Sequence, residues 1–424
     1  MLKKKQSKNE WIGDIPIKWN EKPIRYVFNE IKEKNKLGLV TKALKFTYGT
    51  IISKTDFDAD EDNYVANTIL TYNIVSPGTI MINCLNLNYD FVSQRIGLVK
   101  DNGVITSAYL PIKPINDNVI DSEYANYQLK AWDNVKAFHN MGSGVRKTLD
   151  FNELGKKYIL LPPIEMQKRI VSYLNLKCAE IDALHTDIEK QIETLEEYKK
   201  SIITEAVTKG LDPDVEMKDS GIEWIGMIPK HWKVDMIKYH FRRNEPRKPI
   251  NKEIKVLSVY REYGVIPKDS RDDNHNVTSE DTSKYKFVKK GDLVINKMKA
   301  WQGSLAVSDY EGIVSPAYFI YEFTDNQYNK KYFHYLIRGC YKDEFRRISG
   351  GIREGQWDLS AVEFAKTLIL IPTIEEQNKI VEYIDDVIEK TDAIIADKKQ
   401  QLETLEQYKK SLIYEYVTGK KEVR

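Results

Sequence analysis

The stretch that decides the fold is "LPPIEMQKRIVSYLNLKCAEIDALHTDIEKQIETLEEYKKSIITEAVT" at residues 161–208, because the chain contains it twice. Residues 371–418 read "IPTIEEQNKIVEYIDDVIEKTDAIIADKKQQLETLEQYKKSLIYEYVT", and the two copies align without a gap. A shorter pair, "NEWIGDIPIKW" at 9–19 and "IEWIGMIPKHW" at 222–232, repeats at nearly the same interval. The chain is therefore a tandem duplication of one unit of about 210 residues.

Both copies of the long stretch have the pattern of a helix. Their apolar residues recur at intervals of three and four, and neither helical run contains an internal glycine or proline. In the second copy Thr373 and Glu376 form a capping box directly after Pro372, and in the first copy Pro163 occupies the start. Each copy predicts one helix of roughly 45 residues, or about 67 Å.

A helix with an apolar seam must cover it, and the other copy is the simplest partner. The expected seam residues are Ile170, Leu174, Ile181, Leu184, Ile188, Leu195, Tyr198 and Ile202 in the first copy, and Ile380, Ile384, Val387, Thr391, Ile394, Leu405, Tyr408 and Leu412 in the second, widened there by Val381, Ile388, Ile395 and Leu402. Because the chain must return after each helix, the two helices are expected to run antiparallel as a coiled coil.

The segments between the helices have the pattern of mixed α/β domains. Strands are expected at 79–83, 104–112, 292–296 and 312–321, and helices at 121–141 and 329–348. The expected division is a first domain at 1–160, a first helix at 161–210, a second domain at 211–370, and a second helix with a tail at 371–424. The predicted class is α+β: two similar domains joined by two long helices, with an internal pseudo-twofold duplication.

Composition excludes several classes of protein. Hydrophobic residues make up 42% of the chain, as expected for a folded protein, and no apolar run approaches the roughly 18 residues of a membrane span. The three cysteines lack CxxC spacing, so neither a disulfide framework nor a zinc site is expected. The simplest localisation is cytoplasmic. The net charge of +2 conceals two mildly basic domains alternating with two acidic helices.

Motifs that carry catalysis are absent from the sequence. "LDPDVEMK" at 211–218 has the residue types of a PD…ExK nuclease, but its two parts are fused, and a solvated linker is the better interpretation. There is no GxxxxGK[ST] loop, no GxGxxG and no HExxH. We therefore expect no catalytic residue, no metal site and no cofactor in this chain.

Basic residues interleaved with amide groups suggest contact with DNA. Arginine and glutamine on loops can read guanine and adenine edges, while lysine suits phosphates. The candidates are Arg95, Arg146, Lys147, Lys297, Lys299, Gln302, Arg346, Arg347 and Arg353. For any one of them, the alternative is an ordinary solvated side chain.

At this point the motifs resemble a known family. "EWIGxIPxxW", the helix starts "LPPIEMQKRIVSYL" and "IPTIEEQNKIVEYI", and the junction "ETLEEYKKSIITEAVTKGLDPDVEMKDSGIEWIG" resemble the specificity subunit of bacterial type I restriction-modification systems. The resemblance covers essentially the whole chain. It implies two target-recognition domains, each reading one half of a split double-stranded DNA site, with helices that set the spacing.

The resemblance also implies partners. Two methyltransferase subunits would dock on the helices, and restriction subunits would join through them. S-adenosylmethionine, ATP and Mg²⁺ would then be bound by those partners, so that methylation of adenine and ATP-dependent cleavage belong to the complex. Two alternatives stay open: an enzyme with unrecognised motifs, and an adaptor whose domains bind protein instead of DNA.

Overall fold

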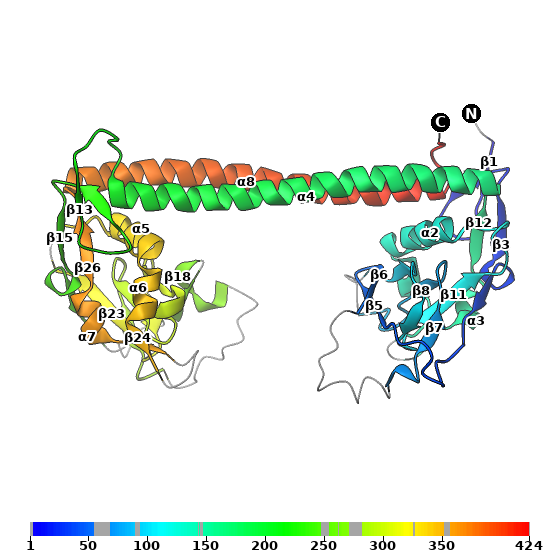
Figure 1. Cartoon of the computed structure of the whole chain (residues 1–424), viewed down its shortest axis with the longest axis horizontal. Helices are drawn as coiled ribbons and strands as arrows, with labels where there is room; N and C mark the ends of the chain where they lie inside the picture. Colours follow the sequence, from blue (N-terminus) through cyan, green and yellow to red (C-terminus); the bar gives the residue numbers. More distant parts are fainter. Residues whose placement is uncertain are drawn as a thin grey trace. The chain divides into compact units, whose positions relative to one another are not determined.

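A computed structural model describes residues 3–54, 68–89, 94–142, 144, 147–246, 254–261, 263–270, 282–324, 327–351 and 357–423. The chain forms two compact units, Met1–Glu189 with Lys399–Arg424, and Lys190–Lys398. Each unit contains one α/β domain together with a part of both long helices, α4 and α8 (Figure 1).

The first domain is built mainly from short strands. Its elements are β1 Lys4–Gln6, β2 Asp14–Pro16, β3 Asn20–Pro23, η1 Ile24–Tyr26, β4 Phe28–Glu30, β5 Leu44–Thr47, β6 Thr50–Ser53, β7 Asn73–Val75, β8 Ile80–Ile82, β9 Ile96–Leu98, β10 Gly103–Ile105, β11 Leu110–Pro114, α2 Ser122–Asn134, η2 Ala137–Asn140, α3 Phe151–Leu154 and β12 Tyr158–Leu161.

The second domain repeats this order and adds to it. Its elements are β13 Met217–Asp219, β14 Met227–Pro229, β15 Lys233–Met236, η3 Ile237–Tyr239, β16 Phe241–Arg243, β17 Leu257–Tyr260, β18 Gly264–Pro267, η4 Lys268–Ser270, β19 Lys286–Val288, β20 Leu293–Asn296, η5 Ala300–Gln302, β21 Leu305–Val307, β22 Gly312–Val314, β23 Tyr318–Phe323, α5 Lys330–Cys340, α6 Lys342–Arg347, β24 Ser349–Gly350, β25 Asp358–Leu359, α7 Ala361–Lys366 and β26 Leu368–Ile371.

The sheets of the two domains correspond strand by strand. A four-stranded antiparallel sheet has the order β4-β11-β8-β9 in the first domain and β16-β23-β20-β21 in the second. The pairs β1–β2, β3–β12, β5–β6 and β7–β10 match β13–β14, β15–β26, β17–β18 and β19–β22. The duplication inferred from the sequence is therefore present in the topology.

Two of the expected strands are each divided by a turn. The run 104–112 separates into β10 and β11, and the run 312–321 into β22 and β23. At each break a hydroxyl accepts a backbone N–H two residues on: Ala108 donates to Thr106 and Ala317 to Ser315, both at 3.4 Å. Such local side-chain bonds compete with strand pairing, which the pattern of apolar residues alone does not reveal.

The predicted domain helices also prove shorter than expected. The predicted helix 121–141 stops at Asn134, and Lys136 adopts a left-handed conformation with φ of 59° before η2 begins. The predicted helix 329–348 is interrupted at Tyr341, which separates α5 from α6. Asp121 and Asn329 cap the first turns of α2 and α5 by accepting backbone N–H groups.

The two long helices are confirmed. Helix α4 spans Ile164–Lys209 and helix α8 spans Ile374–Val417, 46 and 44 residues. Within each unit they run antiparallel. In the first unit Tyr173 stacks near Tyr416, with ring centroids 4.5 Å apart, and Asp182 pairs with Lys409; in the second unit Lys199 pairs with Asp392 at 2.6 Å.

Much of the expected seam is confirmed, because Leu174, Ile181 and Ile188 in α4 and Ile384, Thr391 and Leu412 in α8 are buried. One row of each helix differs from the expectation. In this row Leu184, Tyr198, Ile394 and Tyr408 are each exposed over about half of their surface. The seam instead takes the neighbouring heptad position, which holds Cys178, His185, Ile192 and Lys199 in α4. The sequence favoured the wrong row because its residues are apolar, whereas the true row includes a histidine and a lysine.

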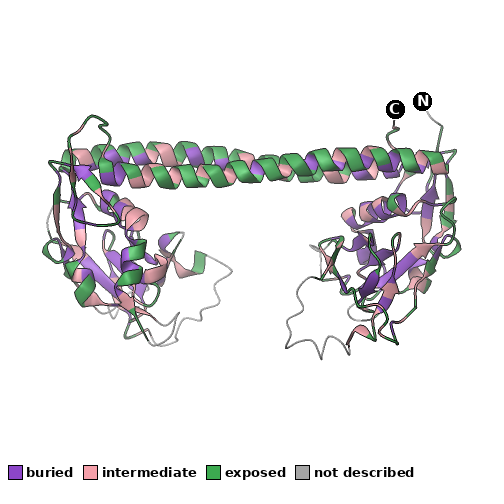
Figure 2. Cartoon of the chain, viewed as in Figure 1, coloured by how far each residue is buried: buried purple, intermediate pink, exposed green. Residues whose placement is uncertain are grey.

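The hydrophobic core of each domain continues into its part of the helix pair. In the first unit Trp132 and Tyr124 lie in one buried cluster with Leu174 and Val417. In the second unit Phe333 lies in one cluster with Val207, Ile380 and Ile384. Figure 2 shows buried strands inside each domain and helices whose outer faces are exposed. Each domain is thus fixed to its helices by apolar packing.

Candidate nucleic-acid interface

The segment that follows β20 carries three of the predicted DNA-contacting residues. Asn296 begins it with a local turn, because its side-chain oxygen accepts the N–H of Met298 at 3.2 Å. Lys299 is exposed after this turn, and Gln302, which is half-buried, ends η5. The turn thus presents a lysine on the surface at the end of a central strand.

A second segment, far along the chain, packs beside this turn. The N–H of Leu359 donates to the carbonyl oxygen of Lys297 at 2.9 Å, and the Lys297 ammonium pairs with Asp358 at 2.8 Å. Trp301 and Trp357 lie with ring centroids 5.5 Å apart. Lys297 is therefore partly neutralised by Asp358, which leaves Lys299 as the more accessible cation of the two.

Helix α6 brings two predicted arginines to the same region, because η5 packs against it. Arg347 makes a two-bond ion pair with Glu344, at 2.6 and 2.8 Å, and the Glu344 side chain is only 4% exposed. Arg346 is exposed on the last turn. The structure therefore gathers five of the predicted residues on one side of the second domain, with Arg347 held by a buried carboxylate.

The remaining predicted residues belong to other places. Arg353 and Arg146 lie outside the described residues. Lys147 is half-buried in a left-handed conformation with φ of 34°, and its carbonyl oxygen accepts the N–H of Leu87. The described candidates of the first domain are thus Lys147, which is half-buried, and Arg95, which is buried.

The prediction for Arg95 is wrong for this conformation. Its side chain is 0% exposed, and its guanidinium donates to the carbonyl oxygens of Asn83, Leu85 and Asn86 at 3.1, 2.8 and 3.4 Å. Its backbone N–H donates to Asp133 at 2.8 Å. Arg95 thus shapes the loop after β8 from within, and burial removes it from contact with DNA.

The junction between domain and helix contains buried polar residues that the sequence analysis missed. Gln377, fully buried, accepts the N–H of Asn329 at 2.7 Å and donates to the carbonyl oxygens of Gln327 and Pro372 at 2.7 and 3.0 Å. Three backbone groups of the domain and the helix start are satisfied by one amide side chain. The only sequence signal was the shared glutamine of "PIEMQ" and "TIEEQ".

The first unit repeats that junction. Gln167, also fully buried, accepts the N–H of Asp121 at 2.9 Å and donates to the carbonyl oxygens of Val119 and Pro162 at 3.0 and 2.8 Å. The two glutamines lie at matching positions of the helices, so the same amide fixes each domain to the start of one helix.

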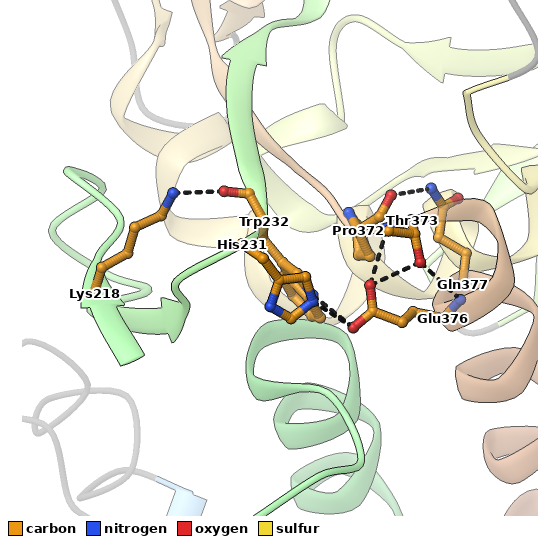
Figure 3. Close-up of polar contacts among 7 residues, drawn as sticks. All are labelled: Lys218, His231, Trp232, Pro372, Thr373, Glu376 and Gln377. Carbon is orange, nitrogen blue, oxygen red and sulfur yellow. Dashed lines mark hydrogen bonds and ion pairs between the residues drawn. The ribbon is translucent and has the colours of Figure 1, made fainter. Parts of the chain in front are cut away.

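The motif that opens each domain packs on the same junction. Glu376 accepts from His231 at 2.7 Å and from the Trp232 indole at 3.2 Å, and it forms the predicted capping box with Thr373 (Figure 3). Lys218 donates to the carbonyl oxygen of Trp232 at 2.6 Å. Trp232 is buried, so in this copy the tryptophan serves packing.

The chain ends complete the same arrangement in the first unit. Tyr414 donates to the carbonyl oxygens of Trp11 and Ile12 at 3.0 and 3.1 Å, and Lys420 donates to that of Asp14. The two termini lie side by side (Figure 1). The C-terminal segment therefore contacts the opening motif of the first domain through backbone carbonyl groups.

Chemical groups that could support catalysis are sparse in the part of the chain that the structure describes. No cluster of three or more metal-ligating side chains occurs there. Burial raises the pKa of the Cys84 thiol to about 12, and burial also raises the pKa of Tyr318. Both groups stay protonated at neutral pH. Among these same residues, no helix has the length and apolar character to cross a membrane.

Two proteins of Methanocaldococcus jannaschii are similar to this chain. The type I restriction enzyme MjaVIII specificity subunit is 25% identical over 346 residues, which cover 76% of this chain and 75% of that protein. A second, provisionally named the type I restriction enzyme MjaX specificity subunit, is 25% identical over 451 residues, with 100% of this chain and 98% of that protein covered.

Solved structures share the fold. A chain from a type I R-M system matches with a TM-score of 0.66 and 13% identity, covering 96% of this chain and 99% of that chain. The HsdS subunit from Thermoanaerobacter tengcongensis matches with a TM-score of 0.53 and 14% identity, covering 96% and 98%. A family model for the type I restriction modification DNA specificity domain matches residues 242–404. The predicted resemblance is confirmed: the chain is similar over its whole length to a type I restriction enzyme specificity subunit, and residues 242–404 match the family model of the type I restriction modification DNA specificity domain.

Proposed function

We propose that this chain is the DNA sequence-recognition subunit of a type I restriction-modification complex. The observation that carries the proposal is the duplicated frame with divergent loops. Both domains have the same strand order and the same glutamine junction, but the amino-acid sequence of the segment after β8 differs from that of the segment after β20. Two related DNA-binding domains held by one scaffold are suited to two different halves of a split DNA site.

The proposed domain division follows the sequence boundaries. Residues 1–160 and 211–370 are the two target-recognition domains, residues 161–210 are the first spacer helix, and residues 371–424 are the second with its tail. Each recognition domain reads one half of a bipartite, asymmetric site. In the second domain Lys297, Lys299, Gln302, Arg346 and Arg347 are proposed to face DNA, with Arg353 as a further candidate. In the first domain the candidates are Arg146 and Lys147.

The chain is proposed to act without catalysis of its own. Two methyltransferase subunits would dock on the helices and bind S-adenosylmethionine, and restriction subunits would supply ATP-driven cleavage with Mg²⁺. The exposed apolar side chains of the helices, among them Leu184 and Tyr198, are suited to burial against such partners.

Mapping of methylated adenines in a host genome tests the proposal. A host carrying this chain with its methyltransferase subunit should show one split, asymmetric motif that disappears when the chain is deleted. Methylation by the purified chain alone would indicate an enzyme instead. A gel shift without any sequence preference, even with methyltransferase subunits present, would favour the protein-binding adaptor.

A further inference from the structure

A cavity of about 370 Å³ opens in the second domain beside the segment that carries Lys299. It is lined by Val256, Leu257, Ser258, Lys268, Tyr285, Asn296, Met298, Lys299, Ser315, Ala317 and Tyr318. The lining combines hydroxyl and amide groups with two lysines and two tyrosine rings. These are the groups that proteins use for the edges of bases and the phosphates beside them.

Three of the segments that line the cavity are each fixed by a hydrogen bond from a backbone N–H. Val256 accepts the N–H of Lys268 at 2.8 Å, next to β17. Asn296 accepts the N–H of Met298 at 3.2 Å, and the Ser315 hydroxyl accepts that of Ala317 at 3.4 Å. The frame of the cavity thus depends on backbone groups and on the half-buried side chains of Asn296 and Ser315, and not on the exposed side chains.

The first domain contains the same frame. Ala43 accepts the N–H of Lys54 at 2.9 Å, which matches the bond at Val256. Asn83 accepts from Leu85 at 3.2 Å, and the Thr106 hydroxyl accepts from Ala108 at 3.4 Å. Corresponding positions of the two domains can therefore be paired by these hydrogen bonds, independently of sequence similarity.

Close packing confirms this pairing. A Cβ on Gly103 would lie 2.7 Å from the carbonyl oxygen of Lys42, and a Cβ on Gly312 would lie 2.7 Å from that of Lys255. Glycine is required at both positions because only a residue without a side chain allows this approach. The strand that starts at Leu257 therefore corresponds to the one that starts at Leu44.

On this common frame, three positions of the second domain differ from their partners in chemical type or shape. Ser258 follows Leu257 on β17, and Met298 and Lys299 follow the turn at Asn296. Met298 and Lys299 are exposed, and Ser258 is half-buried. The second domain thus places its cation on the loop and a neutral hydroxyl on the strand.

The first domain has the reverse arrangement. Lys45 stands at the position of Ser258, while Leu85 and Asn86 stand at those of Met298 and Lys299, and all three side chains are exposed. The lysine therefore lies on the strand in the first domain and on the loop in the second. Lysine favours guanine acceptors, asparagine favours adenine, and methyl-bearing chains contact thymine, so exchanged groups would read different bases.

We propose that Ser258, Met298 and Lys299, at the cavity beside β17 and β20, determine which bases the second domain reads. The cavity takes the edge of a base pair, with the Lys299 ammonium on a guanine acceptor. Lys45, Leu85 and Asn86 do the same for the other half-site. This inference rests on the proposed function, and it names the specificity-determining groups of that function.

The test compares the methylation motif of the wild-type complex with those of three variants of this chain. The variants are the double variant Ser258→Ala with Lys299→Ala, the reciprocal variant Lys45→Ala in the first domain, and the control Lys366→Ala, which removes an exposed lysine paired with Glu363. For the double variant, preference for the native base should fall about 10-fold to 100-fold at one or two positions of one half-site.

The other half-site should keep its sequence, and Lys45→Ala should produce the mirror result there. The control should leave the motif unchanged. An unchanged motif in the double variant, or an equal loss of binding to every DNA sequence, would overturn the inference, because the second result marks phosphate contacts alone. A wild-type complex without any split motif would instead refute the proposed function, so the two failures are distinguishable.

Discussion

The junctions between domains and helices are nearly identical in the two units, whereas the loops that follow the central strands are not. Gln167 and Gln377 make the same three hydrogen bonds. Tyr124 and Tyr332 each donate to the last turns of the partner helix, at Val417 and Val207. The loop at Asn83 is shaped by the buried Arg95, and the loop at Asn296 has no such arginine.

This difference indicates which parts of the duplicated chain can accept substitutions. A junction that satisfies buried backbone groups tolerates few substitutions, because an unsatisfied buried group costs about 1–3 kcal/mol. A loop held by its own turns can exchange exposed side chains at little cost in stability. The junction therefore preserves the architecture, and substitutions in the loops can change which DNA sequence is recognised.

The largest expected effect concerns the tryptophan at each junction. Trp232→Ala should lower the free energy of unfolding of the second unit by about 3–5 kcal/mol, because a fully buried indole leaves a cavity. Trp19→Ala should do the same to the first unit. Hydrogen exchange of each unit measures the loss, and destabilisation spread evenly over both units would contradict the matched junctions.

A smaller and unequal effect is expected at the glycines that end the two helices. Gly419→Ala places a Cβ 2.5 Å from the Pro16 ring at φ of 68°, whereas at Gly210 the nearest atom, of Trp232, is 3.3 Å away at φ of 77°. The left-handed backbone costs both variants about 1–2 kcal/mol, and the clash adds to Gly419→Ala alone. Urea unfolding should rank Gly419→Ala as the less stable, and equal losses would argue against the close contact.

Glu376 gives the second unit a pH-dependent contact without a counterpart at the matching position of the first unit, where Met166 stands. Burial alone would raise the pKa of the Glu376 carboxyl, but hydrogen bonds from His231, Thr373 and Trp232 outweigh it and hold the pKa below the ordinary 4.5. The stabilisation is therefore complete above pH 4.5 and is lost as the pH falls through the lowered pKa.

Glu376→Ala should accordingly cost about 1 kcal/mol at pH 7, and the cost should shrink on acidification. Unfolding in urea from pH 3 to pH 7 measures it. Met166→Ala is the matched control in the first unit, and its effect should not vary with pH. A pH-independent loss at Glu376 would show that the charge contributes nothing.

The smallest expected effect concerns the ion pairs between the helices. Lys199 with Asp392 and Lys409 with Asp182 occupy matching seam positions, and all four side chains reach solvent. Removing either lysine should cost no more than about 1 kcal/mol, and less at high salt. Thermal melts at two salt concentrations measure this. A loss above that range, unaffected by salt, would mean that the lysine stem and not its charge supports the seam.

Prediction from the sequence succeeded where the information was local. The capping box at Thr373 and the long runs without glycine or proline gave the helices, and repetition of whole motifs gave the topology. Prediction failed where the outcome depended on distant partners. Leu184 was chosen for the seam because it is apolar, but His185 lies there instead, since the neighbouring row faces the other helix.

The candidate site divides in the same way. Five basic or amide residues predicted in the second domain do lie in one region, because three follow the turn after β20 and two lie on α6, which packs against η5. Arg95 had the same local signature, yet carbonyl groups at 83, 85 and 86 and the carboxylate of Asp133 surround it. No local pattern distinguishes a solvated arginine from one that organises a loop.

The sequence by itself determined the duplication, the two long helices and the order of the domains, because periodicity, caps and repeats are properties of neighbouring residues. Only the tertiary structure decided which residues are buried at the junctions, which row forms the seam, and that Ser258, Asn296 and Ser315 share one cavity wall. Those outcomes join segments tens of residues apart, and their positions follow from packing and hydrogen bonding of the folded chain as a whole.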